Sequence, residues 1–238
     1  MARLIGVGVG PGDPELVTVK GVRALQEADL VLVPVTDAGD VGRAETVVLT
    51  YVDETHIRRV RFAMHGDDAR RAAWDEAGAA VVDAFSGGAQ SVAFATIGDP
   101  NVYSTFAYLA ATVRDLVPSV VIETVPGITA LQDLSSRSGT VLLEGTESMV
   151  LLPFTAGPDK LRAALAEHDT VVLYKGGRQF DEVRTLVSEA GRLEEAVYGE
   201  HLGLTDERIC AGADVTPPTT YLATLIVAPI RTARGSKL

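Results

Sequence analysis

The sequence predicts an α/β protein built in two parts, and three observations support this fold class. The 238 residues are enough for one large domain or two small ones. The strands expected in the first half are apolar throughout, which is typical of a mainly parallel sheet with helices on both faces. Late in the chain, strands follow one another without long helices between them, which predicts antiparallel pairing and a mixed sheet with helices.

Short apolar runs that end near glycine or proline predict the strands of the first half, at residues 4–9, 29–34, 91–95 and 120–122. We expect helices that end near Glu27 and Arg114, and a further helix around residues 67–85. Asp13 is expected to cap the first helix, with Pro14 in its first position, where a missing N–H costs nothing. Strand, loop, helix and strand thus alternate as they do in a parallel sheet.

The second half continues this pattern and then departs from it. Its strands are predicted at residues 148–153, 170–174, 195–201 and 221–228, and its helices near residues 158–168 and 179–190. We place the boundary after residue 143, which gives an N-terminal α/β domain of residues 1–143 and a C-terminal α/β domain of residues 144–238.

Composition narrows the possible functions. Lysine and arginine number 21 against 32 aspartate and glutamate, a net charge of −11 that argues against broad binding to nucleic acid or to an anionic membrane. Cys210 is the single cysteine, so neither a disulfide scaffold nor an all-cysteine metal site is expected. With no apolar run of membrane-spanning length and no apolar signal core, the expected location is the cytoplasm.

Several common motifs are broken or missing. The dinucleotide pattern G-x-G-x-x-G fails in both registers, because the register from Gly6 meets Pro11 and the register from Gly8 meets Asp13. There is no Walker A sequence and no G-x-S-x-G elbow, and the four histidines are too scattered for a helical metal pair. We therefore expect no metal.

Glycine-bearing loops follow three of the predicted strands, at residues 10–13, 97–100 and 126–129. Loops after parallel strands gather at the carboxyl edge of the sheet, where free backbone groups can reach a ligand. Asp99 offers an acceptor for an amino or hydroxyl group, and Thr129 offers a hydroxyl. The sequence therefore predicts one crevice, although each loop alone could be an ordinary turn that caps a helix.

These loops carry a family resemblance. The segments GVGVGPGDPELVT at residues 6–18, IGDPNVYST at residues 97–105 and VPGITA at residues 125–130 resemble, in order and spacing, three motifs of the tetrapyrrole methylases, which use S-adenosylmethionine. Within that family the chain is most similar to the enzymes that methylate precorrin-2 at C20 in cobalamin synthesis. The segments that carry this closer similarity are residues 103–106, 144–153, 169–175, 207–209 and 221–224, with Arg178.

The resemblance implies a homodimer with its active site in the cleft between the two domains of each chain. S-adenosylmethionine contacts are implied in the first domain at Pro11, Ile97, Gly98, Asp99, Val102, Tyr103, Thr129 and Ala130. In the second domain they are implied at Tyr174, Lys175, His201 and Leu202, where backbone contacts are the safer expectation. No catalytic side chain is identified.

The implied substrate carries eight carboxylates, so an acidic enzyme needs a local basic rim to bind it. The candidates are Arg43, Arg58, Arg59, Arg61 and Arg178, each of which could instead be a solvated surface residue. Two alternatives stay open: a methylase that acts on the cobalt-loaded substrate or at another ring position, and a noncatalytic nucleotide-binding module.

Overall fold

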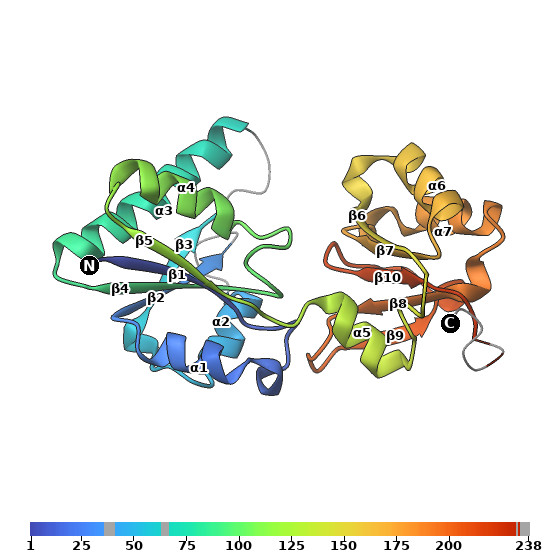
Figure 1. The fold of residues 1–238 in the computed structure, drawn as a ribbon, viewed down its shortest axis with the longest axis horizontal. Coiled ribbons are helices and arrows are strands. Elements are labelled where there is room, and N and C mark those ends of the chain that lie inside the picture. Colours follow the sequence, from blue (N-terminus) through green and yellow to red (C-terminus); the bar gives the residue numbers. More distant parts are fainter. Residues whose placement is uncertain (36–40, 63–66, 232, 234–238) are drawn as a thin grey trace. The chain divides into compact units, whose positions relative to one another are not determined.

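The computed structural model describes residues 1–35, 41–62, 67–231 and 233, and the chain divides into two compact units, residues 1–129 and 130–238 (Figure 1). The sequence places this boundary later, after residue 143. The difference is helix α5 (Ala130–Ser138), whose Leu131 and Leu134 pack into the core beside the strands of the second unit.

The described part of the first unit contains a five-stranded parallel sheet in the order β3-β2-β4-β1-β5. Its strands are β1 (Arg3–Gly8), β2 (Leu30–Val35), β3 (Ile57–Arg61), β4 (Ser91–Thr96) and β5 (Val121–Val125). The four predicted strands are confirmed, with ends shifted by no more than three residues. The sequence does not predict the edge strand β3, because three of its five residues are arginines.

Helices cover both faces of this sheet, as predicted (Figure 1). They are α1 (Val19–Gln26), α2 (Arg43–Val48), α3 (Asp67–Ser86) and α4 (Phe106–Leu116). Ile5 of β1 packs in one core with Leu25 of α1, while the next strand position toward the N-terminus, Leu4, packs in another core with Leu109 of α4. Because successive strand residues point to opposite faces, an apolar strand supplies both cores.

The start of the first helix differs from the expectation. Asp13 accepts a hydrogen bond from the Glu15 N–H (2.9 Å) and caps only a short 3-10 turn, Pro14–Leu16. Helix α1 begins at Val19, after Thr18, whose hydroxyl accepts from the Gly21 N–H at 3.0 Å. Two capping residues lie close together, and each starts its own short helix.

The described residues of the second unit form a mixed five-stranded sheet in the order β6-β7-β10-β8-β9. Its strands are β6 (Met149–Pro153), β7 (Thr170–Tyr174), β8 (Ala196–Glu200), β9 (Arg208–Ala211) and β10 (Thr224–Val227). Strands β6 and β7 are parallel, whereas β10 runs antiparallel to β7 and β8, and β9 runs antiparallel to β8. The predicted antiparallel pairing is confirmed, and the four-residue β9 is an addition to it.

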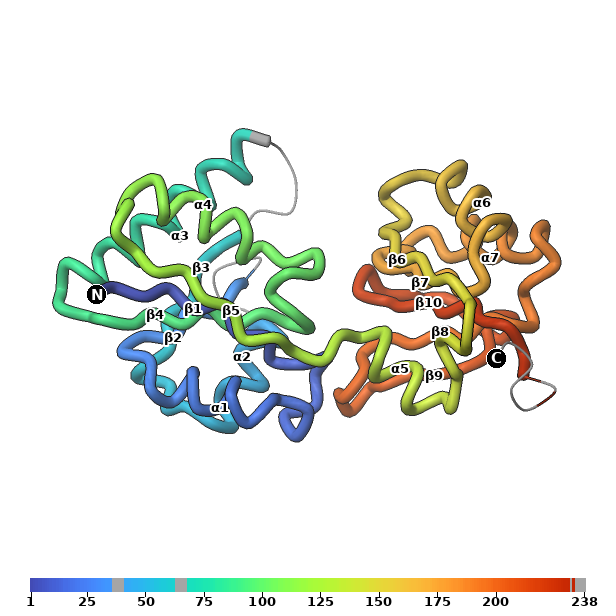
Figure 2. Tube along the Cα trace, viewed as in Figure 1, coloured from blue at the N-terminus to red at the C-terminus, as the bar shows by residue number. Residues whose placement is uncertain are grey.

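Two helices, α6 (Pro158–Glu167) and α7 (Phe180–Glu189), cover one face of this sheet, and α5 covers the other (Figure 2). Leu173 of β7 packs in the core of α6 and α7, while its neighbour Val172 packs with Leu134 of α5. Within the described residues, none of the helices combines the length and the apolarity that a membrane crossing requires.

In each unit, hydrogen bonds from a serine to an aspartate join the beginnings of two parallel strands. Asp29, before β2, accepts hydrogen bonds from the N–H (2.9 Å) and hydroxyl (2.9 Å) of Ser91 at the start of β4. Asp169, before β7, accepts from the N–H (2.9 Å) and hydroxyl (3.1 Å) of Ser148, which precedes β6. Hydrogen bonds from the Gln90 N–H and from Ser91 lower the pKa of Asp29.

Removing the Leu134 side chain tests whether α5 belongs to the second unit. Leu134 is fully buried, so Leu134→Ala is expected to lower the free energy of unfolding by about 2–5 kcal/mol, measured by chemical denaturation. Leu143→Ala is the matched control, because Leu143 is 45% exposed. Equal small losses for the two variants would contradict the packing of α5 on this sheet.

Candidate functional site

The three glycine-bearing loops meet at the carboxyl edge of the first sheet. The Gly98 N–H donates to the Gly10 carbonyl at 2.8 Å, which joins the first loop to the second. The Asp99 carboxylate accepts from the Gly127 N–H at 3.0 Å, which joins the second loop to the third. The predicted convergence of the loops is confirmed.

Glycine is required here because the loops touch backbone to backbone. A Cβ at Gly8 would lie 2.5 Å from the Gly98 carbonyl oxygen, and one at Gly127 would lie 2.1 Å from the same oxygen. Gly98 itself has a φ of +70°. No other residue fits these positions without moving the chain.

Asp99 is a brace between loops rather than a helix cap. Its Oδ1 accepts from the Asn101 N–H at 2.8 Å and its Oδ2 from Gly127. Helix α4 begins only at Phe106, whose N–H donates to the Ser104 hydroxyl at 3.1 Å. The carboxylate retains further lone pairs for a ligand.

The implied contact residues of the first unit all lie on these loops, namely Pro11 on the first, Ile97, Gly98, Asp99, Val102 and Tyr103 on the second, and Thr129 on the third. Ala130, which the resemblance assigns to the first domain, is instead the first residue of α5 in the second unit.

Strained backbone marks three of the implied contacts. In the described parts of the chain, the non-glycine residues with positive φ are Tyr103 (+50°), Lys175 (+61°) and His201 (+55°). Such a conformation costs about 1–3 kcal/mol per residue and concentrates at ligand sites and switches. Lys175 directly follows β7 and His201 directly follows β8. Tyrosine and lysine do not favour this conformation, so the sequence gives no signal for it at Tyr103 and Lys175; histidine is moderately enriched there, which is too weak a signal to predict His201.

In the second unit the implied contacts sit on well-anchored segments. The Tyr174 hydroxyl accepts a hydrogen bond from the Leu131 N–H at 3.0 Å and so ties the end of β7 to the start of α5. The Leu202 side chain is buried in the core, which leaves its backbone for any ligand contact. The His201 ring is paired with the Asp206 carboxylate.

A buried ionic network lies beside His201. Glu200 accepts hydrogen bonds from the Tyr198 hydroxyl and the Thr220 N–H, both at 2.8 Å, and forms an ion pair with Arg208 at 2.6 Å. Burial alone would raise the pKa of Glu200, but the bonds from Tyr198 and Thr220 and the Arg208 charge hold it below its usual value. The network fixes the end of β8, the start of β9 and the segment before β10. Sequence reasoning missed it; the one available signal is that Tyr198 and Glu200 share a strand face.

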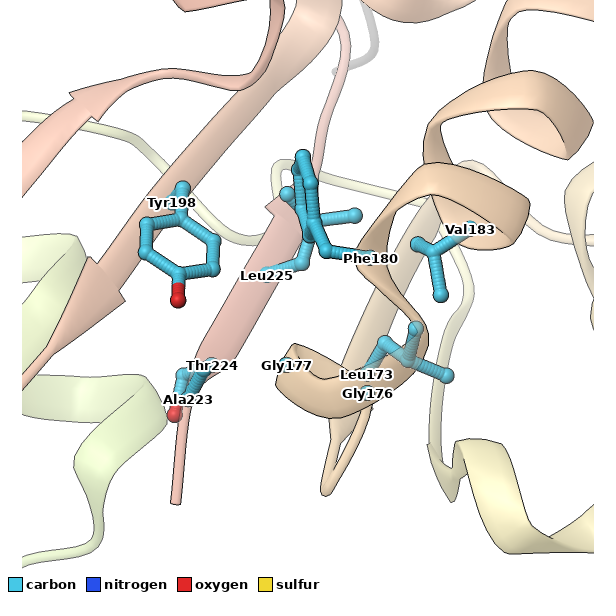
Figure 3. A pocket seen from close by; sticks show the side chains of 9 residues that line it. All are labelled: Leu173, Gly176, Gly177, Phe180, Val183, Tyr198, Ala223, Thr224 and Leu225. Atoms are coloured by element: carbon cyan, nitrogen blue, oxygen red, sulfur yellow. The ribbon is translucent and has the colours of Figure 1, made fainter. Parts of the chain in front are cut away.

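A small cavity lies next to this network, under the turn that follows β7 (Figure 3). Its lining includes Leu173, Gly177, Phe180, Tyr198 and Leu225, which are largely apolar, and its volume is about 10 Å³. That space holds one water molecule at most. It is a packing defect of the core and not a cofactor site.

Comparison with known proteins decides the family. The model of the Tetrapyrrole (Corrin/Porphyrin) Methylases matches residues 3–213. The chain belongs to this family. It is 32% identical to a precorrin-2 C(20)-methyltransferase of Sinorhizobium sp. over 96% of both chains. It is 30% identical to a cobalt-precorrin-2 C(20)-methyltransferase of Salmonella typhimurium, over 94% of this chain and 95% of that one.

Solved structures share the two-domain fold of this methylase. A cobalt precorrin-4 methyltransferase superposes with a TM-score of 0.69 at 22% identity, covering 95% of this chain and 94% of that one. Uroporphyrin-III C-methyltransferase of Thermus thermophilus, complexed with S-adenosylhomocysteine, gives 0.67 at 23% identity, covering 95% and 97%. At these identities the likeness concerns the fold.

The arginines proposed for the methylase's basic rim are not equivalent. Arg59 binds the buried Glu45 carboxylate through Nε (2.9 Å) and Nη2 (2.7 Å). Arg58 points to the opposite face, because Arg59 faces Glu45 on α2 whereas Val60, which shares a face with Arg58, packs with α3 and α4. Arg58, Arg59 and Arg61 line a groove of about 680 Å³ at the β3 edge, which Glu76 and Asp83 also line.

The other two candidates lie elsewhere in the chain. Arg43 is the first residue of α2 in the first unit. Arg178 belongs to the second unit, in the 3-10 turn Gly177–Gln179.

Substitution of Asp99 tests its role as a brace. Asp99→Asn places an amide N–H₂ opposite one of two backbone N–H donors, so the free energy of unfolding is expected to fall by about 1–3 kcal/mol in chemical denaturation. Asp115→Asn, on the exposed end of α4, is the control and is expected to change little. An unchanged stability of the Asp99 variant would contradict the bonded loops.

Substitution of Arg59 separates a structural role from substrate binding. Glu45 is 1% exposed and Arg59 is 38% exposed, so Arg59→Gln leaves a buried carboxylate without its bidentate partner. We expect a lower Tm for Arg59→Gln than for the neighbouring exposed variant Arg58→Gln. Equal Tm values for the two variants would show that the ion pair does not stabilise the fold.

Proposed function

We propose that this protein is a C-methyltransferase that transfers the methyl group of S-adenosylmethionine to C20 of precorrin-2, giving precorrin-3A in cobalamin biosynthesis. The observation that carries the proposal is the bonded assembly, at one sheet edge, of the three loops that bear the family motifs. Relatives with this named activity match the chain over nearly its whole length.

The side-chain position of Gly98 is open. A Cβ built at Gly98 would meet only the Thr129 Cα, at 3.9 Å. Asp99, whose carboxylate can accept further hydrogen bonds, directly follows Gly98, and Tyr103, which has a positive φ, lies on the same loop. We therefore assign the cofactor to Pro11, Ile97, Gly98, Asp99, Val102, Tyr103 and Thr129 in the first unit. In the second unit we assign Ala130, Tyr174, Lys175, His201 and Leu202.

For this reaction the protein mainly has to align the cofactor with the macrocycle. S-adenosylmethionine supplies a methyl group on a positively charged sulfur, and the electron-rich macrocycle carbon supplies the electron pair for the new bond. The protein therefore needs no nucleophile of its own. The loops must hold both ligands with carbon, methyl and sulfur in line, and they must keep water out. Both the alignment and the exclusion of water lower the barrier to methyl transfer. We assign no side chain as the base that removes the C20 proton.

The substrate's carboxylates require local positive charge on an acidic protein. Arg43, Arg58, Arg61 and Arg178 remain the candidates for this rim. Arg59 is already engaged by Glu45, so its contribution to binding is secondary. The family resemblance also supports a homodimer, and the single cysteine fits a reducing cytoplasm.

A second candidate substrate is the cobalt-loaded macrocycle. The relative from Salmonella typhimurium carries that name, at nearly the same identity as the relative named for the metal-free substrate. An alternative of another class is a noncatalytic module that binds adenosine compounds.

A labelled methyl transfer assay tests the proposal. Purified protein with methyl-labelled S-adenosylmethionine and precorrin-2 is expected to yield a product with one added methyl group by mass, placed at C20 by NMR. The parallel reaction with the cobalt-loaded macrocycle decides between the two substrates, and uroporphyrinogen III is the control expected to stay unmodified. Cofactor binding without transfer to any tetrapyrrole would favour the noncatalytic module.

A further inference from the structure

The turn that follows β8 is held at both of its ends. It runs from His201, whose φ is +55°, to Gly203, whose φ is +76°, and we call residues 201–203 the β8 turn. The residue before it is the buried Glu200, the last residue of β8. At its other end the Gly203 N–H donates to the Glu207 carboxylate at 2.7 Å.

Helix α5 fixes the Glu207 carboxylate in turn. The Arg137 guanidinium on α5 binds this carboxylate through Nη1 at 3.2 Å and the Asp133 carboxylate through Nε at 2.8 Å. Asp133 is buried, so the chain of charged groups that ends at Gly203 begins inside the protein. The Leu202 side chain also packs in the core with α5. One end of the β8 turn is therefore attached to this helix.

Arg208 holds the opposite end of the β8 turn. Its guanidinium pairs with Glu200 at 2.6 Å and donates to the Thr216 carbonyl at 2.6 Å. Glu207 and Arg208 are neighbours in the segment 207–209, which carries the closer family similarity and has no role in the proposed chemistry. The structure gives the two side chains related contacts, because one binds the residue before the β8 turn and the other binds the last residue of the turn.

We propose that Glu207 and Arg208 are positioning residues that hold the backbone of His201 and Leu202 in the conformation that binds the cofactor. This inference rests on the proposed function, which assigns those two residues to S-adenosylmethionine. A positive φ at histidine is unfavourable, so the surrounding structure has to maintain it. Because these contacts maintain it before the cofactor arrives, binding does not have to order the turn, and the affinity is higher.

Binding of S-adenosylhomocysteine, measured by calorimetry, tests the role of Glu207. Glu207→Ala removes the acceptor of the Gly203 N–H and is expected to raise the Kd roughly tenfold, because the β8 turn can then leave the binding conformation. Glu207→Gln keeps a carbonyl oxygen as the acceptor and is expected to raise the Kd only about twofold to threefold. An unchanged Kd for Glu207→Ala, or equal losses for the two variants, would overturn the proposal.

Two further variants in the same unit are controls. Val187 of α7 is fully buried in the core on the face of the sheet opposite α5, so Val187→Ala is expected to lower the Tm and leave the Kd unchanged well below the Tm. Glu194→Ala removes one exposed carboxylate and is expected to change neither quantity. If Val187→Ala raised the Kd as much as Glu207→Ala, general destabilisation would explain the effect and the proposal would fall.

Amide hydrogen exchange of the unliganded protein measures the β8 turn itself. The Leu204 N–H donates to the His201 carbonyl at 2.9 Å. The N–H groups of Gly203 and Leu204 are expected to exchange faster in Glu207→Ala than in the wild type or in Val187→Ala, because opening of the turn exposes both groups. Equal exchange rates in the three proteins would show that Glu207 does not hold the turn.

Arg208→Lys tests the other end of the turn. Lysine keeps a positive charge beside the buried Glu200, so the variant is expected to fold, but it lacks the forked guanidinium that contacts both Glu200 and Thr216. The Kd for S-adenosylhomocysteine is expected to rise roughly threefold. An unchanged Kd would overturn the role of Arg208.

The failure of this proposal is distinguishable from the failure of the proposed function. If the wild type methylates precorrin-2 and Glu207→Ala binds S-adenosylhomocysteine normally, the positioning role is wrong and the activity stands. If the wild type binds S-adenosylhomocysteine but methylates no tetrapyrrole, and Glu207→Ala binds it more weakly, the positioning role stands and the activity is wrong. Absence of S-adenosylhomocysteine binding to the wild type overturns the positioning role.

Discussion

The closeness of three backbones at one sheet edge is the constraint on which the first unit depends. Gly8, Gly98 and Gly127 approach one another so tightly that any Cβ at the first or the last would overlap a neighbouring backbone atom. Asp99 then locks the arrangement by accepting N–H groups from its own loop and from the next. The position of every implied cofactor contact in this unit follows from that packing, because all of them lie on the loops it holds.

In the second unit a different carboxylate holds the loops in place. Glu200 accepts a backbone N–H from the segment before β10 and carries the ion pair with Arg208. Through Thr220 it fixes the stretch that touches the Gly177 turn, and it also directly precedes the strained His201. In both units, then, a carboxylate that accepts backbone hydrogen bonds replaces regular secondary structure as the means of holding loops in place.

The arginines of this acidic protein have different surroundings. Arg59 and Arg208 are bound to carboxylates that are almost fully buried, and this explains their presence in an acidic protein without any ligand. The Arg178 guanidinium lies instead over the Tyr221 ring, which attracts a cation without neutralising it.

The amino-acid sequence determined most strands, most helices and the loops that bear the family motifs, because apolar runs and glycine turns are local features, whereas the arginine-rich β3 and the short β9 carry no such signal. It also determined that the loops after β1, β4 and β5 converge, since the strands are parallel. Only the tertiary structure decided that α5 joins the second unit, that Arg59 serves Glu45, and that Glu200 meets Thr220. These partners are distant in sequence or belong to different elements, and chain packing, not periodicity, brings them within bonding distance.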